Sequence, residues 1–120
     1  MNALLLVAHG SRRAESNQEI AALAAKVAAR NSAEFDFVDF AFLELAEPSI
    51  PDGIEHCLKK GATSVSVLPY FLARGTHVVE DIPMEVDKVK QRYPNADIRI
   101  TPYLGTVSDL PDVLLKLAVS

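Results

Sequence analysis

The sequence predicts an α/β fold, with helices on both faces of a four-stranded parallel sheet in a three-layer α/β/α arrangement. Short apolar runs alternate with longer segments of helical periodicity, which is typical of strands joined by crossover helices. Gly and Pro residues fall between these segments and separate them. Because such crossovers are right-handed, few topologies remain, and a flavodoxin-like strand order 2-1-3-4 is the most economical.

Four segments have the composition of strands. The first is a run of five apolar residues that ends in a Gly-Ser turn, which is typical of a strand buried on both faces. The second is aromatic and β-branched, and Pro48 prevents its ladder from continuing. The expected strands are residues 4–8, 35–43, 64–69 and 97–101.

Four helices are expected between and after these strands. Residues 15–30 carry apolar side chains at helical spacing, so this segment is an amphipathic helix. Pro51 suits the first turn of the second helix, and Gly61 ends it after two lysines that favour its negative end. The third helix is expected over residues 79–93, with Pro83 near its first turn, and the last over 109–119.

Composition limits the class of protein. The 120 residues predict a single domain over 1–120, and 49% hydrophobic residues suffice for a real core. A formal net charge of −4 argues against nucleic acid as a main partner. The one cysteine, Cys57, cannot form an internal disulfide, which fits a reducing compartment. The first apolar run is too short for a membrane span or a signal peptide, so we expect a cytoplasmic protein.

The predicted topology brings three polar residues to one edge of the sheet. His9 follows the first strand, Glu44 follows the second, and His77 lies in the loop after the third. In the order 2-1-3-4, the carboxyl ends of these strands lie side by side, where α/β proteins bind ligands. Two imidazoles and a carboxylate suit a divalent metal such as Fe, Co, Ni or Zn. Two unrelated surface histidines beside a solvated glutamate remain the alternative.

Four further residues are candidates for binding a substrate at this edge. Arg12 and Arg74 could bind the carboxylates of an anionic ligand, although exposed arginines often serve solubility alone. Phe71 could form a wall for a flat apolar ligand, or it could simply continue the core. Ser11 offers a helix cap and a side-chain donor at the turn after the first strand.

At these residues the chain resembles the CbiX/SirB family of sirohydrochlorin chelatases, within the class II chelatases. The resemblance rests on a combination of segments in the order and near the spacing of the family: residues 7–12, 42–50, 61–63, 69–72, 75–77 and 81–83. It implies a chelatase-like fold, with metal contacts at His9, Glu44 and His77. Longer members of the family carry two such halves, so this chain looks like the short form, which implies a homodimer.

The resemblance also implies an activity. It is that of a metal chelatase, a lyase that inserts Co²⁺ or Fe²⁺, with Ni²⁺ as a further possibility, into the tetrapyrrole sirohydrochlorin. The product would serve cobalamin or siroheme biosynthesis. The metal is then a substrate, and no prosthetic group is implied. His9 would be the main base and a ligand, His77 a second ligand, and Glu44 a carboxylate ligand or proton acceptor.

Two other classes of function remain open. A non-catalytic carrier of metal or tetrapyrrole would use the same residues, and only turnover separates it from an enzyme. A phosphate- or nucleotide-binding regulatory domain would grip an anion at the turn of Ser11 and would not need His77. The sequence selects neither the physiological metal nor the pathway, and the region after Pro94 carries little of the family pattern.

Overall fold

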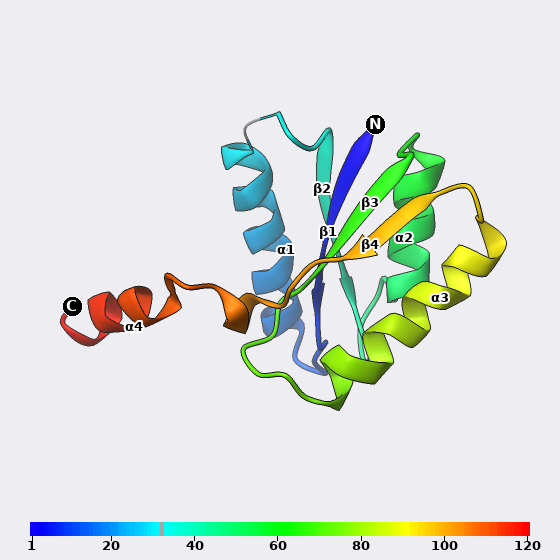
Figure 1. Ribbon diagram of the computed structural model, residues 1–120. Helices are drawn as coiled ribbons and strands as arrows, with labels where there is room; N and C mark the ends of the chain where they lie inside the picture. The colour runs from blue at the N-terminus through cyan, green and yellow to red at the C-terminus, as the bar shows by residue number, and fades with distance from the viewer. Residues whose placement is uncertain (32) are drawn as a thin grey trace.

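The computed structural model describes residues 1–31 and 33–120. A parallel sheet in the order β2-β1-β3-β4 lies at its centre (Figure 1). The strands are β1 (Asn2–Ala8), β2 (Phe37–Phe42), β3 (Ser64–Pro69) and β4 (Asp97–Ile100). This confirms the predicted α/β class and the strand order 2-1-3-4.

Helices cover the two faces of the sheet unequally. Helix α1 lies on one face, and α2 and α3 lie on the other (Figure 1). The helical segments are α1 (Ala14–Arg30), α2 (Ile50–Lys59), a π-helical turn η1 (His77–Asp81), α3 (Ile82–Arg92), a short 3₁₀ turn η2 (Leu104–Thr106) and α4 (Leu110–Ala118). The third helical segment thus begins two residues before the predicted start, because the π-turn precedes the α-helix.

The main core lies between the sheet and the pair α2 and α3. Alternate residues of β1 (Ala3, Leu5 and Val7) are fully buried there against α2 and α3. The other residues of β1 point to the opposite face, toward α1, because side chains alternate along a strand. β1 is therefore apolar on both faces, which explains the unbroken apolar run that predicted it.

Cys57 belongs to this core and has no solvent exposure. Burial raises the pKa of its thiol from 9.0 to about 11, and the nearby carboxylate of Asp39 adds to this rise. The folded state holds the thiol proton more tightly than the unfolded chain, and its contribution to the free energy of unfolding is fully present below pH 9. As the pH rises from 9 toward 11 the unfolded chain loses this proton first, so that contribution is lost.

We therefore expect Cys57 to react slowly with iodoacetamide at pH 8. The folded protein holds a thiolate fraction about 100-fold lower than the unfolded chain, because the two pKa values differ by two units. Mass spectrometry of alkylation with and without urea measures both rates. Equal rates in the two conditions would contradict the buried position of this thiol.

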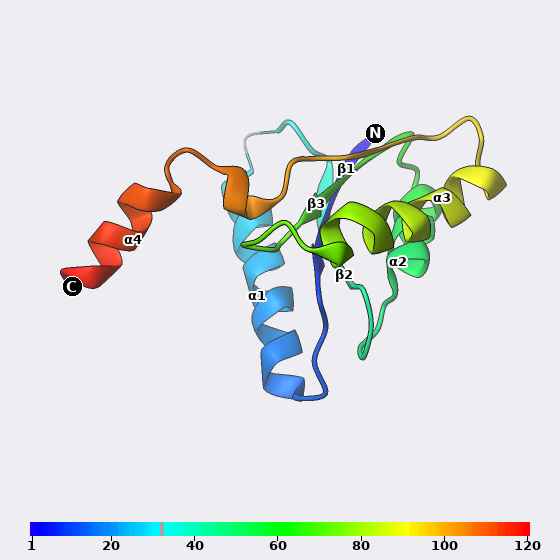
Figure 2. The ribbon, with the colours of Figure 1, turned by 60° about the horizontal axis from the view of Figure 1, so that its bottom comes forward.

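Helix α4 forms where the sequence predicts a last helix, but it does not lie on the sheet. It projects from the rest of the molecule beyond α1, and the carboxyl terminus lies at its far end (Figures 1 and 2). It exposes Val113, Leu114, Leu115 and Leu117, with Leu117 at 68% and Leu115 at 66%. The face of β3 and β4 on the α1 side has no helix over it in the described chain. Among the described residues, no helix is both long and apolar enough to cross a membrane.

Candidate metal site

Backbone hydrogen bonds past the ends of two strands fix His9 and Glu44 as neighbours. The N–H of Leu43 donates to the carbonyl of Ala8 over 2.9 Å, and the N–H of Glu44 donates to the carbonyl of His9 over 3.0 Å. These bonds continue the pairing of β1 with β2 by two residues. Leu45, which follows, has a φ of 66°, an uncommon conformation for a residue with a side chain. The two candidate ligands are therefore held by one rigid ladder.

Gly10 makes this close approach possible. It has a φ of 96°, and a Cβ atom there would lie 1.8 Å from the carbonyl oxygen of Glu44. Only a residue without a side chain fits at this point, because both the backbone conformation and the space exclude a Cβ. Gly10 therefore lets the chain turn away from β1 while His9 stays beside Glu44.

We expect Gly10→Ala to destabilise the fold by at least about 2 kcal/mol, since the left-handed conformation and the steric clash both add to the cost. Gly75→Ala is the matched control, because a Cβ at that position meets no atom within 4 Å. Urea unfolding followed by circular dichroism gives both values. A Gly10→Ala variant that is as stable as Gly75→Ala would contradict the contact.

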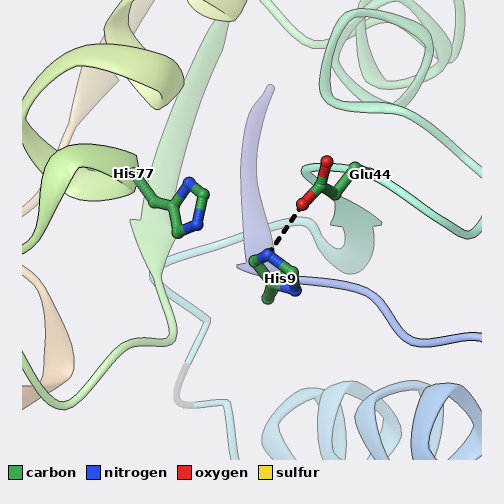
Figure 3. A group of neighbouring side chains, drawn as sticks. All are labelled: His9, Glu44 and His77. Atoms are coloured by element: carbon green, nitrogen blue, oxygen red, sulfur yellow. Dashed lines mark ion pairs between the residues drawn. The ribbon is translucent and has the colours of Figure 1, made fainter.

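The π-turn η1 brings His77 to the same place. The N–H of Ile82 donates to the carbonyl of His77, which is the i to i+5 bond of a π-helix. The rings of His9 and His77 lie with their centroids 4.8 Å apart and are tilted by 57°. Figure 3 shows His9 between the other two side chains, with the ring of His77 turned toward it. The structure thus brings together the three residues that the sequence predicts at this edge.

The possible metal-binding atoms of the three side chains lie close together. Nε2 of His9 lies 2.9 Å from Oε2 of Glu44, and the donor atoms of all three residues lie within 4.8 Å of one another. A divalent ion about 2.1 Å from each of its tetrahedral donors needs those donors about 3.4 Å apart, so small side-chain movements from this arrangement would let all three share one ion. The side chains of His9, Glu44 and His77 are each about half exposed, which leaves room for further ligands.

Each of the two histidines of the cluster has a hydrogen-bond partner for its Nδ1 atom. Nδ1 of His9 lies 3.0 Å from the carbonyl oxygen of Gly10, and Nδ1 of His77 lies 2.7 Å from Oδ2 of Asp81. Both partners accept hydrogen bonds, so they favour a proton on Nδ1. The Nε2 atom of His77 then carries the lone pair that a metal ion needs. Nε2 of His9 lies 2.9 Å from Oε2 of Glu44, so a proton shared by these two atoms is the one that a metal ion would replace.

Hollows lie on two sides of the cluster. One of about 240 Å³ is lined by Leu43, Glu44, His77, Asp81, Met84 and Glu85, so it is mainly acidic. Another of about 280 Å³ lies on the α1 side, and His9, Ser11, Asn17, Phe42 and Tyr70 are among its lining residues. A further hollow, of about 430 Å³, lies at the opposite end of the sheet, before β3 and β4. None of its lining residues is a histidine, a cysteine or an acid.

Ser11 lies beside the cluster, but it does not cap α1 as expected. The residue that precedes the helix is Arg13, which has no side-chain cap. The hydroxyl of Ser11 accepts a hydrogen bond from the N–H of Arg13, and this bond closes a local turn before the helix begins. Asn17, which is not among the predicted site residues, holds this turn by two hydrogen bonds to the backbone of Ser11.

The other predicted binding residues surround the cluster at different distances. Arg12 and Arg74 are exposed, and among the described residues neither forms a hydrogen bond or ion pair with the three candidate ligands. Phe71 packs against the core, and its ring centroid lies 6.3 Å from that of His77. Asp81, the partner of His77, is not among the predicted site residues, because a spacing of four residues pairs side chains only on a helical segment and the sequence predicts a loop at His77.

Comparisons with known proteins agree with this description. The CbiX family profile matches residues 3–119 of the chain. The sirohydrochlorin ferrochelatase of Bacillus subtilis is 42% identical over 103 residues, which cover 86% of this chain and 39% of that protein. The sirohydrochlorin cobaltochelatase of Saccharolobus solfataricus is 35% identical over 97% of this chain and 92% of that protein.

Solved structures give the same result. The structure of SirB from Bacillus subtilis with Fe³⁺ superposes with a TM-score of 0.87 at 36% identity. The match covers 96% of this chain and 45% of SirB, so this chain spans less than half the length of the Bacillus relatives. The family profile covers nearly all of the described fold, including the strands and turns that carry His9, Glu44 and His77. The chain belongs to the CbiX family.

Proposed function

We propose that this protein inserts a divalent metal, Co²⁺ or Fe²⁺, into sirohydrochlorin. The observation that carries the proposal is the open cluster of His9, Glu44 and His77, whose donor atoms lie within 4.8 Å of one another. Relatives similar over most of this chain are named as ferrochelatase and cobaltochelatase of the same macrocycle. A half-exposed cluster with open positions suits a metal that must be passed on rather than stored.

Metal insertion releases two protons, because two pyrrole N–H groups lose theirs as four ring nitrogens bind one divalent ion. The cluster has basic groups for both protons. As the ion moves from the protein ligands to the macrocycle, Nε2 of His9 and the carboxylate of Glu44 become free to accept a proton each. His9 is then the main base, and His77 holds the ion until the ring nitrogens replace it. The contact of 2.9 Å between His9 and Glu44 places the two acceptors together.

The macrocycle is assigned to the solvent-facing side of this cluster. Arg12 and Arg74 are exposed at the edges of the site, where they can pair with peripheral carboxylates of the substrate. Phe71 lies against His77 and offers an apolar surface to the plane of the ring system. Ser11 supplies a polar contact from the turn after β1.

An insertion assay tests this function. Wild-type protein is mixed with sirohydrochlorin and Co²⁺, Fe²⁺ or Ni²⁺, and the absorption change is compared with spontaneous insertion at the same concentrations. A rate well above the spontaneous rate with Co²⁺ or Fe²⁺ supports the chelatase. Tight binding of metal or macrocycle without such a rate indicates a carrier and overturns the enzymatic proposal.

We further propose that two copies of the chain form the active unit, and that α4 of each copy docks on the other. Leu110, Val113, Leu114 and Leu117 recur at i, i+3, i+4 and i+7, so they form one apolar stripe along α4. Nothing in the described chain covers this stripe. A surface of this kind on a helix that stands apart indicates an interface.

A surface that fits this helix lies on the same chain. We call it the α1 groove, a hollow of about 400 Å³ that lies along α1, lined by Glu19, Ile20, Ala22, Leu23, Lys26 and Tyr70. Because the chain carries both the helix and the groove, a two-fold axis satisfies both copies at once and closes the assembly. The length of the Bacillus relatives, more than twice that of this chain's match, is consistent with two such units acting together.

The docked helix would also border the site. Glu19, Ile20 and Tyr70 line both the α1 groove and the hollow beside His9. A helix of the second copy in the groove would therefore close this hollow on its α1 side. The dimer would supply a wall that one copy lacks.

A further inference from the structure

Asp81 has a defined contact with one candidate ligand. Its Oδ2 atom lies 2.7 Å from Nδ1 of His77, which is the length of a strong hydrogen bond to a charged acceptor. Both residues belong to η1, where they are four residues apart. The contact is therefore set by the π-turn itself and does not depend on a distant segment.

From this contact we infer that Asp81 is a positioning residue for His77. The carboxylate accepts a hydrogen bond from Nδ1–H, so it holds the proton on Nδ1 and leaves Nε2 with its lone pair. It also fixes the rotation of the His77 ring, which is turned toward His9 (Figure 3). Carboxylates that orient metal-binding histidines in this way raise their basicity as ligands.

The surroundings of His77 explain why such a partner is needed. The side chain is 44% exposed, so packing alone leaves its ring free to rotate. The ring of Phe71, with its centroid 6.3 Å away, is the aromatic neighbour on the side of the core. His9, by contrast, sits at a strand end, where the carbonyl of Gly10 performs the same task for its Nδ1. His9 thus has an acceptor at each ring nitrogen, the Gly10 carbonyl and the Glu44 carboxylate, whereas Asp81 is the acceptor beside His77.

This inference rests on the proposed metal site, but its test does not require metal insertion. Co²⁺ alone is titrated into the wild-type protein and its variants, and the visible absorption of the bound ion gives the affinity. We expect Asp81→Ala to weaken Co²⁺ binding by about 10- to 100-fold. Asp81→Asn should fall between this variant and wild type, because its amide oxygen still accepts the bond without a charge. Glu80→Ala is the matched control, because it removes an exposed charge from the same turn.

A double-mutant cycle separates positioning from direct ligation. If Asp81 acts through His77, then adding Asp81→Ala to His77→Ala will not weaken Co²⁺ binding further. A further loss in this background would make Asp81 a metal ligand and would overturn the inference. The ¹⁵N chemical shifts of the His77 ring give a second readout, because they report which nitrogen is protonated. A ring whose tautomer is unchanged in Asp81→Ala would also contradict the positioning role. Neither readout depends on whether the protein turns over sirohydrochlorin.

Discussion

Replacing His9 by alanine is expected to lower the enzymatic rate of Co²⁺ insertion into sirohydrochlorin by about 100- to 10,000-fold. The substitution removes the proposed base, and it also removes a donor atom that lies 2.9 Å from Glu44. The rate is measured from the absorption of the macrocycle, after subtraction of spontaneous insertion. His77→Ala is expected to act in the same direction through loss of a ligand.

The third histidine of the chain provides the control. His56 lies on α2, where its Nε2 atom is 3.9 Å from a carboxylate oxygen of Asp39. It is exposed and takes no part in the cluster, so His56→Ala should leave the insertion rate unchanged. Insertion that survives both His9→Ala and His77→Ala would show that this cluster is not the site of the reaction. A general loss in all three variants would point to stability, which circular dichroism checks.

Replacing Leu117 by glutamate is expected to convert the dimer to a monomer. The wild-type mass in solution should be about twice the 13.0 kDa of one chain, and the variant should have the mass of a single chain. A carboxylate at this position gives up the burial of a leucine side chain and must be desolvated against Ile20 and Leu23, with Glu19 as well as Lys26 beside it. This opposes association by about 3 kcal/mol, or about 100-fold in the dissociation constant. Light scattering after size-exclusion chromatography measures both masses. Because the docked helix borders the hollow beside His9, insertion should fall together with dimerisation.

Leu115→Glu is the control on the same helix. Leu115 is as exposed as Leu117, at 66% against 68%, but it lies off the stripe formed by Leu110, Val113, Leu114 and Leu117. This variant should remain a dimer. A cross-link tests the arrangement directly, because cysteines at Leu23 in the α1 groove and at Leu117 should join two chains on oxidation. A wild-type protein of single-chain mass would overturn the proposed dimer, and a dimer that tolerates Leu117→Glu would overturn the exchange of α4.

The sheet could be predicted from the sequence because its signals are local and agree with one another. The segment from Ser64 to Pro69 forms a strand with the predicted bounds, and the apolar run of β1 is buried on both faces. The start of the third helical segment was less predictable. Residues that begin a π-turn differ little in propensity from those that begin an α-helix, so the sequence does not mark His77 as the first residue of the turn.

The sequence predicts the three residues of the candidate site, but not the hydrogen bonds that hold the turns around them. Strand order alone places His9, Glu44 and His77 at one edge, and the structure brings their donor atoms within 4.8 Å. Hydrogen bonds of side chains in the surrounding turns depend on distances that the sequence does not contain. For this reason Ser11 was expected to cap the helix, although it bonds Arg13 instead, and Asp81 was absent from the predicted site. The apolar stripe of α4 predicts that the helix packs, but not what it packs against.

The backbone elements that carry His9, Glu44 and His77 have a consequence for metal selection. His9 and Glu44 extend adjacent strands and are joined by backbone hydrogen bonds, so the distance between their Cα atoms varies little. His77 lies on a turn that continues into α3, so small shifts of that helix alter its distance from the other two donors. The position of His77 relative to the other two ligands is therefore the part of the site that can adjust. Such a site can match ions of different radius without rearranging its other two ligands, which is compatible with relatives named for iron and for cobalt on one scaffold.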